Sequence, residues 1–192
     1  MEVTIDASKR YTYADYLTWL DDKRRELFDG FVHLMTPAPS SYHQEYSTQL
    51  IIQFGNYLTG KVCKVYHAPF DVRLPKNGQA LDSEINTVVQ PDISVVCDLN
   101  KIDSKGCLGA PDLVVEITSP SSTKHDLEYK YQLYQAAGVK EYWLLYPNDK
   151  TVHVFFLENG QYQFKGMYHS GNQVPVNIFP GFQIDLHRVF DL

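Results

Sequence analysis

The sequence of 192 residues has only three cysteines, no hydrophobic run of membrane-spanning length and no excess of positive charge. Cys63, Cys97 and Cys107 are odd in number and form no C-x-x-C pair, which argues against a disulfide framework and against a zinc site. The N-terminal stretch MEVTIDASKR lacks the apolar core of a signal peptide. We therefore expect a cytoplasmic protein with no membrane segment.

The charge balance restricts how this chain can bind nucleic acid. Its formal net charge is −6 at pH 7 and its sequence pI is about 5.6, whereas proteins that coat DNA without sequence preference are normally basic. Contacts with nucleic acid must therefore be local, assisted by a metal ion, or built across an oligomer. The length and the hydrophobic content of 44% predict a single domain over residues 1–192.

The N-terminal half of the sequence combines helix signals with a hairpin signal. Thr12 and Asp15 have the spacing of a capping box, and Asp29-Gly30 between two short apolar runs predicts a tight turn. A 3.6-residue apolar rhythm indicates a longer helix further on. We expect helices over about 12–21 and 46–58, strands over about 26–28, 31–35, 62–67 and 70–74, and a loop over 75–87.

The C-terminal half predicts a strand–helix–strand unit followed by a second hairpin. The strand expected over 110–118 is almost continuously apolar, as strands covered on both faces are. The other expected elements are a strand over 88–97, a helix over 124–137 ended by Gly138, a strand over 141–146, and a hairpin of 151–157 and 161–168 turning at Asn159-Gly160. We therefore expect an α/β fold in which helices flank a mixed central β-sheet, with additional β-hairpins.

One carboxylate interrupts the apolar strand 110–118. Glu116 is costly there unless its charge is compensated, and a cation is one way to compensate it. Asp92, just after Pro91 at the start of the strand 88–97, is a natural second ligand. Two such carboxylates can hold Mg²⁺ with open water positions, and the ion can polarise a phosphate oxygen and acidify a bound water. Pairing of Glu116 with an Arg, Lys or Tyr side chain is the alternative.

Longer stretches carry a resemblance to a known family. They are 26–30 and His43 near the N-terminus, and 90–96, 111–122, 126–134 and 138–143 in the middle of the chain. Together they resemble a large bacterial family classed as restriction endonucleases within the PD-(D/E)XK nuclease superfamily. The resemblance implies a restriction-endonuclease-like core, DNA as the substrate and a homodimer. It also implies Mg²⁺, or Mn²⁺ as a substitute, bound by Asp92, Glu116 and the backbone carbonyl of Ile117.

The sequence departs from the superfamily pattern at Thr118, where a lysine is usual and where a hydroxyl cannot supply positive charge. Lys130, on the helix that follows, resembles the lysine that some superfamily members place there. It lies at the rim of the buried stripe of that helix, so its long stem can reach the carboxylates. The alternative is a surface ion pair with Asp126, four residues earlier.

Other residues are candidates for accessory roles. Glu26 resembles an accessory acidic residue of these nucleases, or is a solvated hairpin residue. His43 can contact a phosphate or act as an acid or base, or it caps or packs a helix. Asp112 is an alternate ligand or simply the start of its strand. Tyr142 and Trp143 are expected in the core rather than at a base-stacking surface.

Three functions are compatible with these observations. The leading hypothesis is a Mg²⁺-dependent DNA endonuclease in which Asp92 and Glu116 hold the metal and Lys130 orients or activates the attacking water. A non-catalytic binding or assembly module with a nuclease fold is favoured by the acidic pI and by the missing lysine at position 118. The third is a metal-dependent hydrolase of small phosphoesters. The aromatic second hairpin can form a dimer interface or pack on its own sheet.

Overall fold

The computed structural model describes residues 3–35, 39–76, 81–119 and 124–191, and the side chains of 124–126 lie outside that description. The helices are α1 (Tyr13–Tyr16), α2 (Ser41–Leu58), α3 (Lys124–Ala137) and α4 (Leu186–Phe190), with a short 3-10 helix at Leu99–Lys101. The strands are β1 (Arg25–Phe28), β2 (Phe31–Leu34), β3 (Lys64–His67), β4 (Val72–Arg73), β5 (Val88–Val89), β6 (Ile93–Val96), β7 (Ile102–Asp103), β8 (Gly106–Leu108), β9 (Leu113–Ile117), β10 (Glu141–Tyr146), β11 (Thr151–Glu158), β12 (Gln161–His169), β13 (Gln173–Pro175) and β14 (Gln183–Asp185). No helix in these ranges is both long and apolar enough to cross a membrane.

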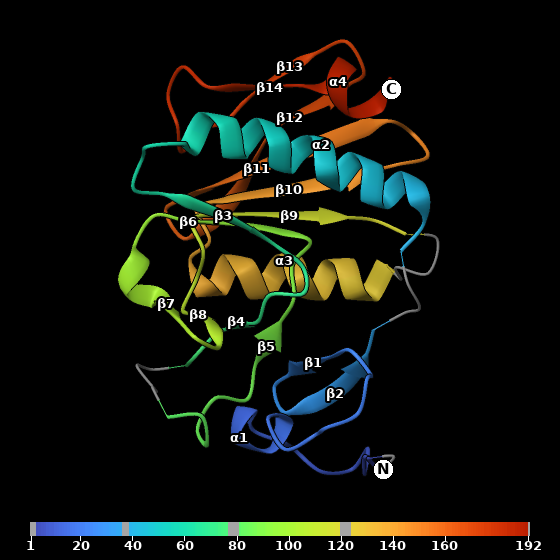
Figure 1. Cartoon of the computed structure of the whole chain (residues 1–192), viewed down its shortest axis with the longest axis vertical. Coiled ribbons are helices and arrows are strands. Elements are labelled where there is room, and N and C mark those ends of the chain that lie inside the picture. The colour runs from blue at the N-terminus through green and yellow to red at the C-terminus, as the bar shows by residue number, and fades with distance from the viewer. Residues whose placement is uncertain (1–2, 36–38, 77–80, 120–123, 192) are drawn as a thin grey trace.

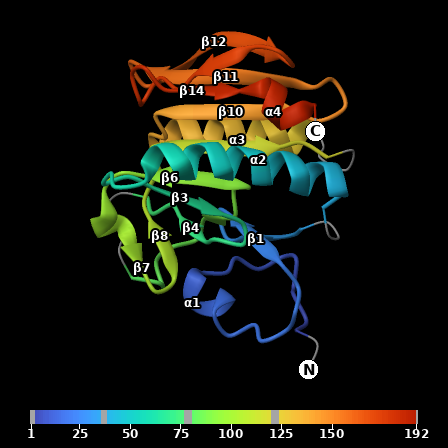
Figure 2. The ribbon, with the colours of Figure 1, turned by 45° about the horizontal axis from the view of Figure 1, so that its top comes forward.

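The central layer is a mixed sheet in the order β12-β11-β10-β9-β6-β3. β9 and β10 run parallel and are connected through α3, whereas the other neighbours in this sheet are antiparallel. α2 lies across one face of the sheet and α3 across the other (Figures 1 and 2). The predicted mixed sheet flanked by helices, and the predicted strand–helix–strand unit, are therefore confirmed.

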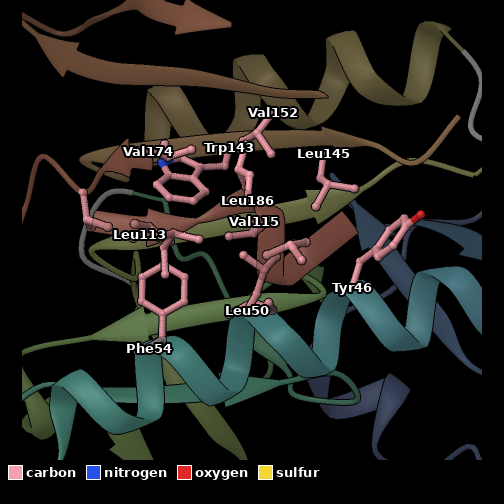
Figure 3. Close-up of a cluster of buried hydrophobic side chains, with 14 of the residues drawn as sticks. Tyr46, Leu50, Phe54, Leu113, Val115, Trp143, Leu145, Val152, Val174 and Leu186 are labelled. Carbon is pink, nitrogen blue, oxygen red and sulfur yellow. The ribbon is translucent and has the colours of Figure 1, made fainter. Parts of the chain in front are cut away.

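The core between α2 and the central sheet is built from aliphatic and aromatic side chains. Tyr46, Leu50 and Phe54 recur at every fourth position, so they share one face of α2 and point at the sheet (Figure 3). They meet Val115 of β9 and Trp143 of β10, both fully buried. Burial of each such side chain is worth about 1.5–3 kcal/mol. Because strand side chains alternate, this packing turns the next residue of β9 toward α3.

A second mixed sheet, in the order β2-β1-β5-β4-β8-β7, lies on the far side of α3 (Figure 1). Phe28 and Val72 of this sheet belong to the same buried cluster as Tyr134 of α3 and Leu144 of β10. The helix α3 is therefore enclosed between two sheets, and its polar side chains can reach residues of both. The β1–β2 pair is the hairpin predicted at Asp29-Gly30, where both residues have positive φ, 51° and 87°.

The prediction of one continuous strand over 88–97 is wrong. Residues 88–89 pair in the second sheet, whereas residues 93–96 pair in the central sheet. Pro91 has no backbone N–H to donate to a ladder, and the N–H of Gln90 donates to a carboxylate oxygen of Glu26 at 2.8 Å. The chain therefore passes from one sheet to the other at 90–92, and this places Asp92 at the boundary between the layers.

Other sequence predictions need correction. The helix expected over 12–21 is only α1, although the capping box of Thr12 and Asp15 that predicted its start is present. The argument against a disulfide is also wrong, because Cys63 and Cys97 are bonded across a sequence separation of 34. They flank the paired residues Lys64 and Val96 of β3 and β6, a juxtaposition that cysteine spacing does not reveal. The elements β7, β8, β13, β14 and α4 were not predicted.

Candidate active site

Asp92 and Glu116 lie at the same end of the central sheet. Ile93 pairs with Val115 in the antiparallel β6–β9 ladder, so Asp92 and Glu116 occupy the next positions along the two strands. Oδ2 of Asp92 accepts a hydrogen bond from the backbone N–H of Ile117 at 2.7 Å. The carboxylate of one strand is thus bonded to the backbone of the other, which holds it beside Glu116.

Glu116 is nearly buried and shares its Oε1 atom between two donors of α3. The Tyr134 hydroxyl donates at 2.6 Å and the Lys130 ammonium at 3.0 Å. Burial raises the pKa of Glu116 to about 7; the positive charge of Lys130 opposes this shift and the negative charge of Asp92 adds to it. Glu116 is therefore paired with a lysine and a tyrosine, which was the alternative to a cation. Its other oxygen, Oε2, accepts no hydrogen bond from any described residue.

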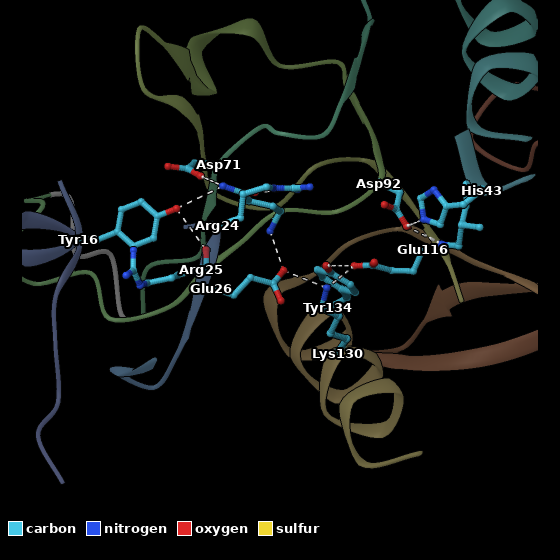
Figure 4. A network of polar contacts seen from close by, with 12 residues as sticks. Tyr16, Arg24, Arg25, Glu26, His43, Asp71, Asp92, Glu116, Lys130 and Tyr134 are labelled. Atoms are coloured by element: carbon cyan, nitrogen blue, oxygen red, sulfur yellow. Dashed lines mark hydrogen bonds and ion pairs between the residues drawn. The ribbon is translucent and has the colours of Figure 1, made fainter. Parts of the chain in front are cut away.

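Lys130 joins the two sheets. Its Nζ atom lies 2.9 Å from Oε1 of Glu26 on β1 and 3.0 Å from Oε1 of Glu116 on β9 (Figure 4). Burial works against the charged ammonium, but the two carboxylates outweigh it and hold the pKa of Lys130 above its usual range. Lys130 thus contacts Glu116 of the candidate metal pair. The side chain of Asp126, the alternative partner, lies outside the described residues.

Glu26 is not a solvated hairpin residue. It is 6% exposed, and besides Lys130 it accepts a hydrogen bond from the backbone of Gln90. The side chain of Gln90 continues the network, because its Oε1 accepts from Arg24 and its Nε2 donates to Asp71. A polar network of the second sheet therefore supports Lys130 from the side opposite to Glu116.

His43 stands in the first turn of α2 and faces Asp92. Its backbone N–H is capped by the Ser40 hydroxyl at 3.3 Å, whereas its Nε2 atom lies 3.3 Å from Oδ2 of Asp92. Burial lowers the pKa of His43, but the hydrogen bond and the charge of Asp92 outweigh burial and raise it above the ordinary value. The imidazole is thus part of the site and orients the Asp92 carboxylate.

Asp112 and Thr118, the other two accessory candidates, make no side-chain contact with Asp92 or Glu116 in the hydrogen bonds of the described residues. Asp112 lies before the first residue of β9, at the end opposite to Ile117, and accepts from the backbone of Cys97 at 2.8 Å and from Lys140 at 2.7 Å. The structure does not bring Asp112 to the pair. Thr118 lines the same cleft as Asp92 and Glu116, and its backbone N–H donates to Leu145.

Tyr134 and Gln90 are site residues that sequence reasoning missed. Tyr134 was expected only as part of the buried stripe of its helix, yet it donates the 2.6 Å hydrogen bond to Glu116. A signal was present, because Tyr134 is four residues after Lys130 and so shares its helix face. Gln90 had no such signal, since its role depends on the passage of the chain between the sheets.

The site opens into a cleft of about 1070 Å³ whose lining includes Glu26, His43, Asp92, Glu116, Thr118 and Lys130. No cluster of three His, Cys, Asp or Glu side chains suited to a metal ion occurs among the described residues. Mg²⁺, however, is usually held by one or two carboxylates and keeps several waters. Asp92 and Glu116 each retain one oxygen that accepts no hydrogen bond from a described residue, so the donor set fits a hydrated magnesium ion.

Comparison with known proteins places these features in a family. The model of the Uma2 family, described as "Putative restriction endonuclease", matches residues 13–187. A protein of Synechocystis sp. (strain ATCC 27184 / PCC 6803 / Kazusa), described as "Uncharacterized protein slr1290", is 30% identical over 135 residues, which are 68% of this chain and 65% of that protein. This chain therefore spans slightly less than two thirds of the length of that relative.

A solved structure shares the fold. It is described as the crystal structure of "a putative nuclease belonging to DUF820" from Anabaena variabilis ATCC 29413 and superimposes with a TM-score of 0.73 over 94% of this chain and 97% of that chain. The two sequences are 16% identical, so this likeness establishes the fold alone. Because the family model spans nearly the whole chain, the resemblance inferred from the sequence is confirmed, and this protein belongs to the Uma2 family.

Proposed function

We propose that this protein is a Mg²⁺-dependent DNA endonuclease that hydrolyses phosphodiester bonds at the Asp92–Glu116 pair. The observation that carries the proposal is the convergence in one cleft of Asp92, just before β6, with Glu116 of β9 and Lys130 of α3. The family description, "Putative restriction endonuclease", supports the same chemistry.

The metal site of this proposal consists of oxygen ligands. One oxygen each of Asp92 and Glu116 would hold Mg²⁺, with the backbone carbonyl of Ile117 as a further ligand and Mn²⁺ as a substitute. A bound ion supplies charge neutralisation at the scissile phosphate and a more acidic water. The hydrogen bond from Ile117 N–H to Asp92 keeps one ligand in place before an ion arrives.

The remaining residues position the reactants. Lys130 donates hydrogen bonds to the attacking water or to the phosphate, which orients the water for in-line displacement. Glu26 holds the ammonium of Lys130 from the opposite side at 2.9 Å. His43 orients Asp92 through the 3.3 Å contact of its Nε2 atom. Asp112 has no role in this proposal, because both its oxygens are engaged at the far end of β9.

The proposal includes a homodimer, because cutting both strands of a duplex calls for two sites. The edge strand β12 exposes Phe164 and Met167, which are 57% and 58% exposed, and this apolar surface is the one that we assign to the contact. Light scattering of the purified protein after gel filtration measures the mass directly, and a monomer at all concentrations would exclude this part of the proposal.

A plasmid assay tests the activity. We expect supercoiled plasmid to be converted to nicked and linear forms with Mg²⁺ or Mn²⁺, and to stay intact with EDTA. Cleavage of a chromogenic phosphodiester without cleavage of plasmid would instead identify a hydrolase of small phosphoesters. Intact substrate under all of these conditions would contradict a catalytic role.

One observation favours a second function, a non-catalytic module that uses this fold for binding or assembly. Lys130 already compensates the charge of Glu116, so the buried carboxylate needs no ion to be stable. Isothermal titration with Mg²⁺ or Mn²⁺ separates the two functions. Saturable binding that is lost in Asp92→Asn supports the nuclease, and no binding supports the module.

A further inference from the structure

The cleft continues beyond the Asp92–Glu116 pair along an aromatic wall. Tyr42 and Tyr46, one turn apart on α2, have ring centroids 6.3 Å apart, and Tyr46 meets Phe190 of α4 edge-on at 5.0 Å. All three side chains line the cleft. Tyr46 and Phe190 are buried, whereas Tyr42 is 64% exposed. Tyr42 is therefore an exposed ring that packs beside the buried ring of Tyr46, which in turn packs against Phe190.

A positive charge accompanies this wall. Lys150 lines the same cleft, and its Nζ atom contacts Asp191 at 3.0 Å and the carbonyl of Phe190 at 3.1 Å. Its side chain is still 47% exposed, so the ammonium can also meet a ligand in the cleft. The half-buried ring of Tyr146, at the end of β10, lines the cleft as well and is held against His153 at 4.7 Å.

We infer that this aromatic wall, formed by Tyr42, Tyr46 and Phe190 with Lys150 beside it, is a subsite for an unpaired nucleic-acid strand. A base stacks on the exposed ring of Tyr42 and a backbone phosphate lies beside Lys150. The inference rests on the proposed function, because the bound strand continues to the Asp92–Glu116 pair through the same cleft. It assigns a single strand to this part of the cleft, either a free strand or one that is locally separated from its complement within a duplex.

The charges of the cleft favour an unpaired strand over a duplex. Among the described residues, the Lys and Arg side chains of its lining are Arg24, Lys130 and Lys150, and each is already engaged by protein acceptors. Nonspecific duplex binding depends on many phosphate contacts, and a chain with net charge −6 is poorly equipped for them. Stacking on an aromatic ring needs no net positive charge and tolerates any base sequence.

Fluorescence anisotropy tests the subsite without cleavage. The probes are a fluorescein-labelled single-stranded DNA, the RNA strand of the same sequence and the DNA duplex, each titrated with the protein in EDTA. We expect either unpaired strand to bind at least about tenfold more tightly than the duplex. Whichever of the DNA and RNA strands binds with the higher affinity identifies the preferred sugar, deoxyribose or ribose. Tyr42→Ala should weaken the binding of that strand by about 5- to 150-fold, the range for loss of one stacked base.

Two variants serve as controls. Tyr42→Phe keeps the ring and should bind within about threefold of the unchanged protein. Phe31→Ala removes an exposed aromatic ring of β2 that does not line the cleft, and should have no effect. Equal or tighter binding of duplex, binding of no probe, or full affinity in Tyr42→Ala would each overturn the inference.

Cleavage of the same probes with Mg²⁺ separates this inference from the proposed function. If duplex is cut and Tyr42→Ala changes nothing, the subsite is wrong while the nuclease stands. If the unpaired strand binds in a Tyr42-dependent way but no probe is cut, the subsite stands while the catalytic proposal fails.

Discussion

The ammonium group of Lys130 lies 3.0 Å from Oε1 of Glu116, although fourteen residues separate the two in the sequence. Position 118, where the superfamily pattern has lysine, is a threonine here. The positive charge that the strand lacks is therefore present in space, supplied by the helix that follows it. The same ammonium contacts Glu26 of the second sheet, so it links the candidate active site to both sheets.

Loss of the Lys130 charge should destabilise the protein and stop cleavage. In Lys130→Met, two largely buried carboxylates remain without their shared partner, and breaking a buried pair in this way costs about 3–5 kcal/mol. Urea unfolding measures this loss. Lys165→Met is the matched control, because it breaks the more exposed pair with Glu158, worth at most about 1 kcal/mol. Equal stability of the two variants would contradict the structural role of Lys130.

Asp92→Asn should remove metal binding while the fold is retained. The amide oxygen of asparagine can still accept the hydrogen bond from Ile117 N–H, but the negative charge is gone. Loss of a supporting contact at a metal site typically costs about 10–100-fold in affinity or activity, and loss of a direct ligand should cost more. Titration calorimetry and the plasmid assay measure both effects. Asp98→Asn is the control, because asparagine can still cap the short 3-10 helix that Asp98 precedes, at an exposed position. It should bind metal and cleave plasmid like the unchanged protein.

Removing the buried hydroxyl of Tyr134 and that of Tyr142 should have different effects on the stability of the protein. Tyr134→Phe deletes the 2.6 Å hydrogen bond to Glu116 and should cost about 1.5–3 kcal/mol, as for hydrogen bonds to charged groups. Tyr142→Phe deletes a buried hydroxyl that has no partner among the described residues, so its effect on stability should be neutral or slightly favourable. The difference between their urea midpoints is the measurement, and a larger loss in Tyr142→Phe would refute this assignment.

The disulfide between Cys63 and Cys97 predicts how many free thiols a thiol-reactive reagent will titrate in the unfolded protein. With Cys63 and Cys97 bonded, the unfolded protein without reductant should expose one reactive thiol, that of Cys107. After reduction the count should rise to three, the number of cysteines in the sequence. Reduction should also lower the free energy of unfolding by about 3–4 kcal/mol, as expected for a loop of this length. Three thiols before reduction would show that the bond is absent from the protein in solution.

Glu141 should make stability fall as the pH rises. It is fully buried and accepts hydrogen bonds from Trp143 Nε1 at 2.8 Å and Ile178 N at 2.9 Å, yet burial raises its pKa above the ordinary value. A carboxyl with a higher pKa in the folded state stabilises that state below the unfolded pKa and loses this contribution as the pH rises through the folded pKa.

The test is a series of urea unfolding curves from about pH 4.5, the ordinary value for this carboxyl, upward. Glu141→Gln cannot ionise, so its stability should decline less steeply, while the part of the decline that comes from Glu116, whose pKa is also raised, remains. Glu158→Gln, at an exposed position on β11, should keep the decline of the unchanged protein. The same slope in both variants would assign the pH dependence to another group.

Local sequence signals anticipated the elements that depend on few residues. The turns at Asp29-Gly30 and Asn159-Gly160 adopt positive φ, as predicted, because these residue types tolerate that conformation. Tyr142 and Trp143 are fully buried, as expected. The second hairpin extends the central sheet as β11 and β12, which confirms that it packs on its own sheet. Whether it also forms a dimer contact stays a prediction.

Contacts between distant segments could not be anticipated in the same way. The division of the segment 88–97 follows from the hydrogen bond between Gln90 and Glu26, which are 64 residues apart. Cys63 and Cys97 meet because β3 pairs with β6, and nothing in their spacing specifies that pairing. Glu26 belongs to the site only because the second sheet packs on α3.

By itself, the sequence determined the two hairpins and the strand–helix–strand unit around α3, where the local signals are strong. It also singled out Asp92 and Glu116, because a carboxylate in an apolar strand is costly without compensation. Only the tertiary structure decided what compensates Glu116: Lys130 and Tyr134 of α3, with Glu26 holding Lys130 from the second sheet. The physical reason is the sequence distance over which each kind of interaction acts. Periodicity and turn chemistry act over a few residues, whereas charge pairing in a buried site depends on which surfaces the whole chain brings together.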